Sequence, residues 1–271
     1  MKLSRIAWLF LTLTLSIVSV LLVSQRASSQ DITTNILQRV FLIKYGNKFC
    51  SSFTVEVQQR QYLITSRHSF IGIKSGESIQ IFRNNKWDSL TVKIIDPQPR
   101  DIDIIVFVLP IQISPSFPIE PTIDGLVLAQ DMYFLGFPFG LGMDGNVLNN
   151  GFPLPFVKKG ICSAINYSAS KGYTEIYVDG HNNPGFSGGP VVFVDKGSRS
   201  LRIAGVVSGY RNQDDKVFRR IVSKMGDKDA KIELAETDMI VQSNSGIVLG
   251  YSIKNAIDAI SKNPIGPIVK E

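Results

Sequence analysis

The run Asn183-Pro184-Gly185-Phe186-Ser187-Gly188-Gly189-Pro190 decides how this chain of 271 residues is interpreted. It places one serine between glycines, and a proline closes the turn. Because glycine adopts backbone angles that other residues avoid, a sharp turn here would expose the Ser187 hydroxyl and aim the amides of Gly185 and Ser187 at one point. That geometry suits a nucleophile beside an oxyanion hole. A glycine-rich surface loop with an incidental serine is the alternative.

Two further segments carry groups that such a nucleophile needs. Gln61–His68 is an apolar, strand-like run that ends in one of the chain's two histidines. Histidine titrates near pH ~6.5, so it can take and return a proton at neutral pH. Asp101–Pro110 opens with acids and continues as a β-prone run. A carboxylate there could accept a hydrogen bond from the imidazole and fix its tautomer. Taken singly, each segment also fits a plain surface position.

Together the three segments resemble the trypsin-like (chymotrypsin-fold) serine peptidases, bacterial members included. Their chain order, His then Asp then Ser, is the order of that family, and Gly205–Gly209 is similar to the strand that lines its substrate cleft. The resemblance implies Ser187 as nucleophile and His68 as general base. It also implies Asp103 as the acid that orients the base, with Gly185 and Ser187 as the oxyanion hole.

Two aspartates, Asp101 and Asp103, compete for the position of the orienting acid. Choosing Asp101 would put Asp103 inside the buried strand, where an unpaired carboxylate is costly. Choosing Asp103 leaves only apolar residues downstream. We therefore predict Asp103 and keep Asp101 as the alternative.

The chain departs from the pancreatic-type enzymes at Phe186, where they carry an aspartate that pairs with a newly cut N-terminus. Phenylalanine cannot form that ion pair, so we expect the site to form without this activation step.

The resemblance also implies the pocket for the residue before the cut. His181, six positions before the nucleophile, would lie at its base. Ser208, Gly209 and Tyr210 would form a wall, with Tyr210 narrowing the mouth. With no carboxylate at the base, cutting after Lys or Arg is not expected. We expect small or medium uncharged residues there, with Glu as the second option.

Met1–Ser29 is typical of an export signal, with Lys2 and Arg5 before the apolar stretch Ile6–Val23 and small residues before Gln30. We expect an exported protein, periplasmic or secreted. The apolar stretch is near the lower limit for a membrane span, so an uncleaved N-terminal anchor is the alternative and the one expected route to a membrane.

Composition excludes several classes of function. The formal charge of +6 includes three basic residues of the signal; without them it is about +3, too mild for nucleic-acid binding. Without a Cys-x-x-Cys motif and with well-separated histidines, neither a metal nor another cofactor is expected. Cys50 and Cys162 are expected as buried free thiols, with a disulfide as the alternative. The spacing Gly140-x-Gly142-x-x-Gly145 lacks the helix and the acid of a dinucleotide site.

The coarse pattern predicts an all-β fold. Phe53–Val57 alternates as a half-buried strand does, and a hairpin is expected around Asn84-Asn85. The resemblance implies two six-stranded antiparallel β-barrels of the chymotrypsin type, at residues 30–115 and 116–271, joined near Pro110–Pro121. A short amphipathic helix is predicted at Ile253–Ile260. The charged stretch Tyr210–Thr237 interrupts the strand pattern and is expected to be an exposed insertion.

We expect a serine endopeptidase that acts on proteins or peptides, and two other functions compete with it. An α/β-hydrolase needs its histidine after the serine, and both histidines here precede Ser187. A catalytically silent, peptide-binding protein on the same fold remains the alternative, since fold does not guarantee activity.

Overall fold

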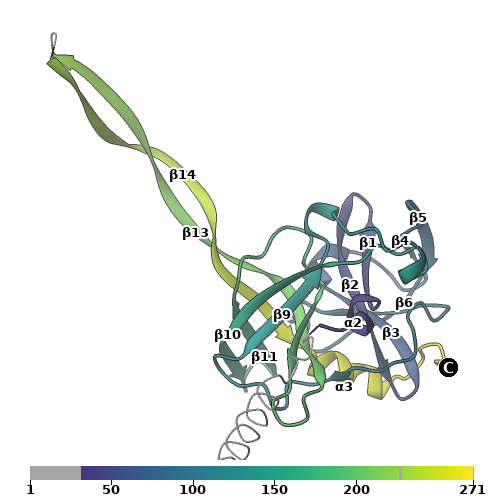
Figure 1. Ribbon diagram of the computed structural model, residues 1–271. Coiled ribbons are helices and arrows are strands. Elements are labelled where there is room, and N and C mark those ends of the chain that lie inside the picture. Colours follow the sequence, from purple (N-terminus) through teal and green to yellow (C-terminus); the bar gives the residue numbers. More distant parts are fainter. Residues whose placement is uncertain (1–31, 226–227, 271) are drawn as a thin grey trace, which may run out of the picture. The chain divides into compact units, whose positions relative to one another are not determined.

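The first sheet of the computed structural model, which describes residues 32–225 and 228–270, is built from the first half of the chain (Figure 1). The strand order is β5-β4-β1-β2-β3-β7-β6. The strands are β1 (Val40–Tyr45), β2 (Lys48–Val57), β3 (Arg60–Thr65), β4 (Ser78–Arg83), β5 (Lys86–Thr91), β6 (Lys93–Ile95) and β7 (Ile105–Val108). β5 and β6 are one run of chain interrupted at Val92, so this run pairs with β4 at one end of the sheet and with β7 at the other.

The hairpin between β4 and β5 forms where the sequence predicted it. Asn84 and Asn85 both have positive φ, 49° and 58°, as the central residues of a type I′ turn do. Asparagine tolerates this left-handed conformation better than most residues, which is why the turn forms here.

The second sheet is built from the second half of the chain. Its strands are β8 (Glu120–Pro121), β9 (Asp131–Gly136), β10 (Phe156–Ser168), β11 (Tyr173–Asp179), β12 (Pro190–Val194), β13 (Leu201–Met225) and β14 (Lys228–Ser252). The order is β12-β9-β10-β11-β14-β13-β8, and an additional β12–β13 pairing joins the sheet into a ring of six strands. The short β8 lies outside that ring and pairs in parallel with β13.

The all-β prediction with two curled antiparallel sheets is thus confirmed. Each sheet counts seven strands rather than six, because β6 is split from β5 and β8 is added. The predicted terminal helix is α3 (Lys254–Lys262), and a single turn of helix, α2 (Thr34–Leu37), precedes β1. Short 3₁₀ turns occupy Arg67–Phe70, Pro138–Gly140 and Asn146–Asn149. No helix in the described ranges is long and apolar enough to cross a bilayer, and Met1–Ser29 lies outside those ranges.

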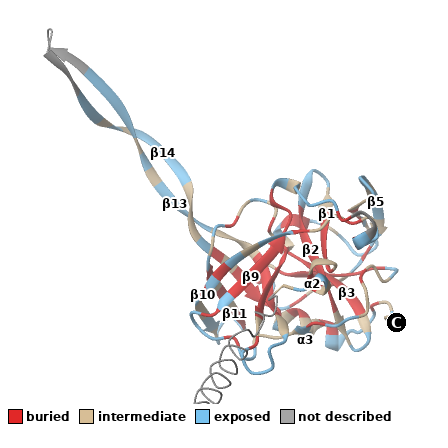
Figure 2. Cartoon of the chain, viewed as in Figure 1, coloured by how far each residue is buried: buried red, intermediate tan, exposed pale blue. Residues whose placement is uncertain are grey.

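Each sheet encloses its own apolar core, and buried residues line the inner faces of the strands (Figure 2). In the first core, Phe70 packs edge-on against Phe107 with ring centroids 4.9 Å apart. In the second, Phe134 packs edge-on against Phe186 at 5.2 Å. The division of the chain at residues 115 and 116 remains a prediction.

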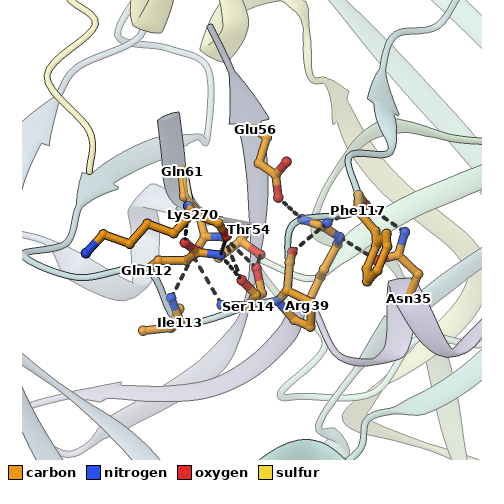
Figure 3. Close-up of polar contacts among 11 residues, drawn as sticks. Asn35, Arg39, Thr54, Glu56, Gln61, Gln112, Ile113, Ser114, Phe117 and Lys270 are labelled. Carbon is orange, nitrogen blue, oxygen red and sulfur yellow. Dashed lines mark hydrogen bonds and ion pairs between the residues drawn. The ribbon is translucent and has the colours of Figure 1, made fainter. Parts of the chain in front are cut away.

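A buried polar network fixes the connection between the two sheets onto the first one (Figure 3). Arg39, whose side chain is 1% exposed, forms an ion pair with Glu56 at 3.1 Å and donates to the carbonyls of Pro115 and Phe117. Gln61 accepts from the backbone amide of Ile113 at 2.8 Å. The proline-rich connection is therefore held in place rather than left as a free linker.

The stretch from Tyr210 to Thr237 differs from expectation. Where burial is described, at residues 210–222 and 232–237, the side chains are exposed or partly exposed, as predicted, but the stretch is regular: β13 and β14 continue beyond the sheet as a long antiparallel hairpin (Figure 1). We call residues 210–248 the ribbon. Its strands pair from Tyr210↔Val248 to Met225↔Lys228, with irregularities at Tyr210/Asn212, Lys216/Phe218 and Ser223/Met225.

Candidate active site

The turn before Ser187 presents two backbone amides that have no acceptor. Gly185 has φ +104°, and a Cβ there would lie 2.2 Å from the carbonyl oxygen of Phe137, so only glycine fits. The Pro184 carbonyl accepts from the Phe139 amide at 2.7 Å. Because C=O and N–H point in opposite directions across a trans peptide, the Gly185 amide points away from Phe139. Among the described residues, neither this amide nor that of Ser187 donates a hydrogen bond.

Ser51 of β2 fastens this turn from the first sheet. Its backbone amide donates to the Ser187 carbonyl at 2.9 Å, and its hydroxyl donates to the Gly185 carbonyl at 2.6 Å. The same hydroxyl accepts from the Phe137 amide at 2.9 Å. On the other side, the Gly188 amide donates to the Val207 carbonyl of β13 at 2.7 Å. The turn is therefore held by both sheets.

The structure brings His68 and Asp103 into contact. His68 follows β3, and Asp103 precedes β7, which pairs with β3. Nδ1 of His68 lies 2.6 Å from Oδ2 of Asp103, and the His68 backbone amide donates to Oδ1 at 2.8 Å. The carboxylate thus holds the ring through Nδ1–H and leaves Nε2 free to accept a proton. Asp101, the alternative acid, is exposed.

Ser208 of β13 contacts both halves of this arrangement. Its hydroxyl donates to Oδ2 of Asp103 at 2.6 Å, and its carbonyl accepts from the Ser187 hydroxyl at 3.0 Å. The Ser187 hydroxyl therefore points at Ser208 rather than at His68 in this structure. Rotation about one side-chain bond redirects it, and such contacts commonly tighten only with substrate bound.

The segment that carries this geometry matches a known protein family. The model of the trypsin-like peptidase domain matches residues 50–198, which is more than half of the chain. This chain belongs to the trypsin-like peptidase family. The matched segment contains His68, Asp103 and Ser187, whereas Ser208 and the ribbon lie beyond it. Comparison with curated protein sequences finds no significant match.

Solved structures agree on the fold of this trypsin-like peptidase. An inactive mutant form of Rv3671c from M. tuberculosis H37Rv is 12% identical, with a TM-score of 0.51, covering 86% of this chain and 90% of that one. The HtrA-type protease AlgW with a tripeptide is 19% identical, with a TM-score of 0.53, covering 84% of this chain and 61% of that one. At such identities the likeness concerns the fold alone.

Arg67 has a role in this peptidase that the sequence did not suggest. Its Nε donates to the Ile102 carbonyl at 3.1 Å, its Nη2 donates to the Pro97 carbonyl at 3.2 Å, and it forms an ion pair with Asp96. These contacts hold the segment before Asp103, whose carboxylate contacts His68.

Lys158 of β10 braces the loop before the glycine-rich turn. Its ammonium donates to the His181 carbonyl and to Oδ1 of Asn183, and it lies 5.4 Å from the centroid of the Phe186 ring. Burial lowers the pKa of this ammonium below its usual value. Phe186 is fully buried and packs in the second core, so the loop is anchored by an apolar side chain and a lysine.

The residues predicted for the substrate pocket fall into two groups. Ser208, Gly209 and Tyr210 follow one another along β13 and are all partly exposed. The His181 side chain is exposed, and only the backbone carbonyl of this residue contacts Lys158. Asn182, which sequence reasoning passed over, is 2% exposed, and its Oδ1 has no hydrogen-bond partner among the described residues.

The two cysteines are free and buried, as predicted. Burial raises the pKa of the Cys50 thiol to about 11, partly opposed by its hydrogen bonds with Thr65 and Ser69. Burial also raises the pKa of Cys162. Both thiols are therefore neutral at physiological pH. The described side chains include no cluster of three or more His, Cys, Asp or Glu that could hold a metal ion.

Proposed function

We propose that this trypsin-like peptidase is an exported serine endopeptidase with a His68–Asp103–Ser187 triad. The observation that carries the proposal is the arrangement around Ser187. The amides of Gly185 and Ser187 have no acceptor, and His68, which follows β3, contacts the Asp103 carboxylate. Export rests on the composition of Met1–Ser29.

The residues divide the chemistry among them. Ser187 Oγ attacks the carbonyl carbon of the peptide bond while Nε2 of His68 takes the hydroxyl proton. Asp103 keeps the ring oriented and stabilises its charged form. The Gly185 and Ser187 amides donate to the oxygen that becomes negative, which is commonly the largest single contribution to such catalysis.

The acyl-enzyme then forms in one step and is hydrolysed in a second. His68 returns its proton to the leaving nitrogen as the carbon–nitrogen bond breaks, and the amino-terminal half of the substrate stays on Ser187 as an ester. A water molecule, deprotonated by His68, attacks that ester. The proton returns to Ser187 Oγ as the acid product leaves.

Proteins or peptides are the proposed substrates, and the tripeptide with the AlgW neighbour supports this class. For the residue before the cut we propose small or medium uncharged side chains. Cutting after Lys or Arg is not expected, because a basic side chain would need a carboxylate at the base of the pocket. The loop before Ser187 carries His181 and Asn182 there instead.

Substitution of Ser187 or His68 tests the proposal. The chain from Gln30 is incubated with a diverse peptide library, beside Ser187→Ala and His68→Ala. Each substitution should lower turnover by roughly 10⁵- to 10⁶-fold, while the thermal midpoint stays within a few degrees. Hydrolysis by Ser187→Ala at the wild-type rate would refute the assignment.

One observation favours a catalytically silent peptide-binding protein instead. The Ser187 hydroxyl donates to the Ser208 carbonyl and not to His68. A serine-directed phosphonate separates the two functions. An active enzyme is labelled and loses the label on Ser187→Ala, whereas a binding protein is not labelled at all.

A further inference from the structure

The outer edge of β13 loses its strand partner next to Ser187. On this edge β12 pairs with β13 from Val194↔Leu201 to Pro190↔Val206, and the Val207 amide still donates to the Gly189 carbonyl at 2.9 Å. Beyond Val207, the described residues place a strand only on the other edge, where β14 pairs with β13 along the whole ribbon. The backbone groups that point to the free edge are open to a further strand.

The free edge of β13 begins beside the candidate nucleophile Ser187. The first residue beyond the pairing is Ser208, whose carbonyl accepts from the Ser187 hydroxyl at 3.0 Å. A polypeptide joined to Ser187 Oγ through its carbonyl carbon would therefore start at this edge. Since β13 runs away from Ser187 and the attached segment runs toward it, the two would be antiparallel, the slightly more stable arrangement.

The ribbon also exposes apolar side chains that have no cover. The pairs Phe218↔Glu236, Arg220↔Leu234 and Val222↔Ile232 lie on one face, because pairs two positions apart point the same way. On that face Phe218 is 50% exposed, Val222 50%, Ile232 52% and Leu234 69%. An isolated two-stranded hairpin is marginally stable in water, and a third strand would widen this face and place its own alternate side chains beside these apolar ones.

Cross-strand contacts keep β14 as the inner partner and leave the outer edge of β13 open. The Thr237 hydroxyl donates to the Val217 carbonyl at 2.7 Å, the Ser243 hydroxyl donates to Asp215, and Lys216 forms an ion pair with Glu236. Strand exchange at the β13–β14 seam is therefore disfavoured, so a partner strand adds at the free edge.

We propose that the outer edge of the ribbon, from Asn212 to Val222, beyond the predicted pocket wall, is an extended binding site for an unfolded polypeptide on the amino-terminal side of the cut. The segment adds to β13 as an antiparallel strand, the mode of recognition in which main-chain hydrogen bonds give affinity. The inference rests on the proposed function. At 3.3–3.4 Å per residue this edge is roughly 35 Å long, so substrates with long extended segments before the cut are favoured, apolar at alternate positions.

Two labelled peptides and a shortened chain test this directly. The short peptide carries three residues before the cut, and the long one carries twelve more, alternating valine and threonine. Binding is measured by fluorescence anisotropy on the full chain with Ser187→Ala, which prevents cleavage. The comparison chain also has residues 213–243 replaced by Asn-Gly, a two-residue hairpin turn. It keeps Asn244, whose amide donates to the Asn182 carbonyl.

The long peptide should bind the full chain at least about tenfold more tightly than the short one, the effect of one or two net hydrogen bonds. The two peptides should bind the shortened chain about equally. N-methylation of alternate residues in the long peptide gives a matched control. Methylation in one register removes the amides that face β13 and should abolish the tenfold gain, whereas methylation shifted by one residue should leave most of it.

Equal binding of both peptides to the full chain would overturn the inference, and so would equal sensitivity to the two methylation registers. A full chain that sediments as a dimer through the ribbon, with no gain from peptide length, would assign the edge to a second copy and also overturn it. Cleavage of the short peptide by the shortened chain with Ser187 intact is scored separately. If the unshortened chain also fails to cleave the short peptide, the result counts against the proposed function and not against the proposed binding site on the outer edge of β13.

Discussion

The glycine-rich turn at residues 185–189 and the ribbon at residues 210–248 are held in opposite ways. An added Cβ at Gly188 would lie 2.1 Å from Thr65 Oγ1, and one at Gly185 would lie 2.2 Å from a carbonyl oxygen. At Gly246 in the ribbon, an added Cβ meets nothing within 4 Å. The turn is fixed by several segments at once, whereas the ribbon has a single strand partner. Substitutions in the first should change chemistry, and those in the second should be silent until something binds.

Apart from the Ser187 and His68 variants, the largest effect on the chemistry proposed at the glycine-rich turn is expected from Asp103→Asn, which acts through His68. The amide would hold His68 in the wrong tautomer, so kcat should fall by roughly 10⁴-fold. Asp101→Asn, in an exposed residue two positions away, should change kcat by less than about threefold. Steady-state kinetics on one peptide measures both. Reversed effects would transfer the orienting role to Asp101.

Removing the Ser208 hydroxyl should have the next largest effect. Ser208→Ala deletes a 2.6 Å hydrogen bond to the Asp103 carboxylate, and hydrogen bonds to charged groups contribute about 1.5–3 kcal/mol. We expect kcat to fall about 10- to 100-fold with KM little changed. The substitution should also shift the pH profile of kcat/KM. Ser208→Thr keeps the hydroxyl and should recover most of the rate. An alanine variant with wild-type kcat would leave Ser208 as a pocket wall only.

Lys158→Met tests the brace of the loop before the turn. The methionine keeps most of the apolar stem but cannot donate to the His181 carbonyl or to Asn183. We expect kcat to fall about tenfold, since two hydrogen bonds that fix the loop are lost. Lys159→Met is the matched control, because Lys159 pairs with Asp131 at 2.8 Å on the exposed surface, where such pairs contribute little. Equal effects of the two changes would show that the brace does not position the site.

The smallest effect is expected in the ribbon. Phe218→Ala removes a half-exposed ring and should change the free energy of unfolding by less than about 0.5 kcal/mol. Phe186→Ala, the same change in the glycine-rich turn, should cost about 3–5 kcal/mol because that ring is fully buried. Chemical denaturation followed by tryptophan fluorescence gives both values. A large loss at Phe218 would mean that the ribbon face is already covered in the free protein.

The sequence predicted the parts of the fold where local chemistry is specific. The Asn84-Asn85 hairpin follows from the positive φ that asparagine tolerates, and the apolar run of β3 leads directly to His68. The contact between His68 and Asp103 was expected from the resemblance to the trypsin-like peptidases, and the pairing of β3 with β7 explains how it forms.

What the sequence did not predict depends on contacts distant along the chain. The Ser51 hydroxyl reaches the Gly185 carbonyl across 134 positions, and nothing around Ser51 in the sequence marks that role. The ribbon was missed for another reason. Both of its faces carry charges, such as Arg220 on one and Arg219 on the other, so the alternation that identifies a half-buried strand is absent.

Phe186 ties the order of the glycine-rich turn to the integrity of the second core, since its ring packs on Phe134 beneath the turn. In enzymes whose turn waits for a cleaved terminus, a folded but inactive precursor exists. Since a fully buried phenylalanine stands where those enzymes carry the pairing acid, we expect folding and the formation of the oxyanion hole to be one event here. Heat should therefore remove activity and tertiary structure along the same curve, and cutting the chain ahead of the first sheet should not raise the activity of the folded protein.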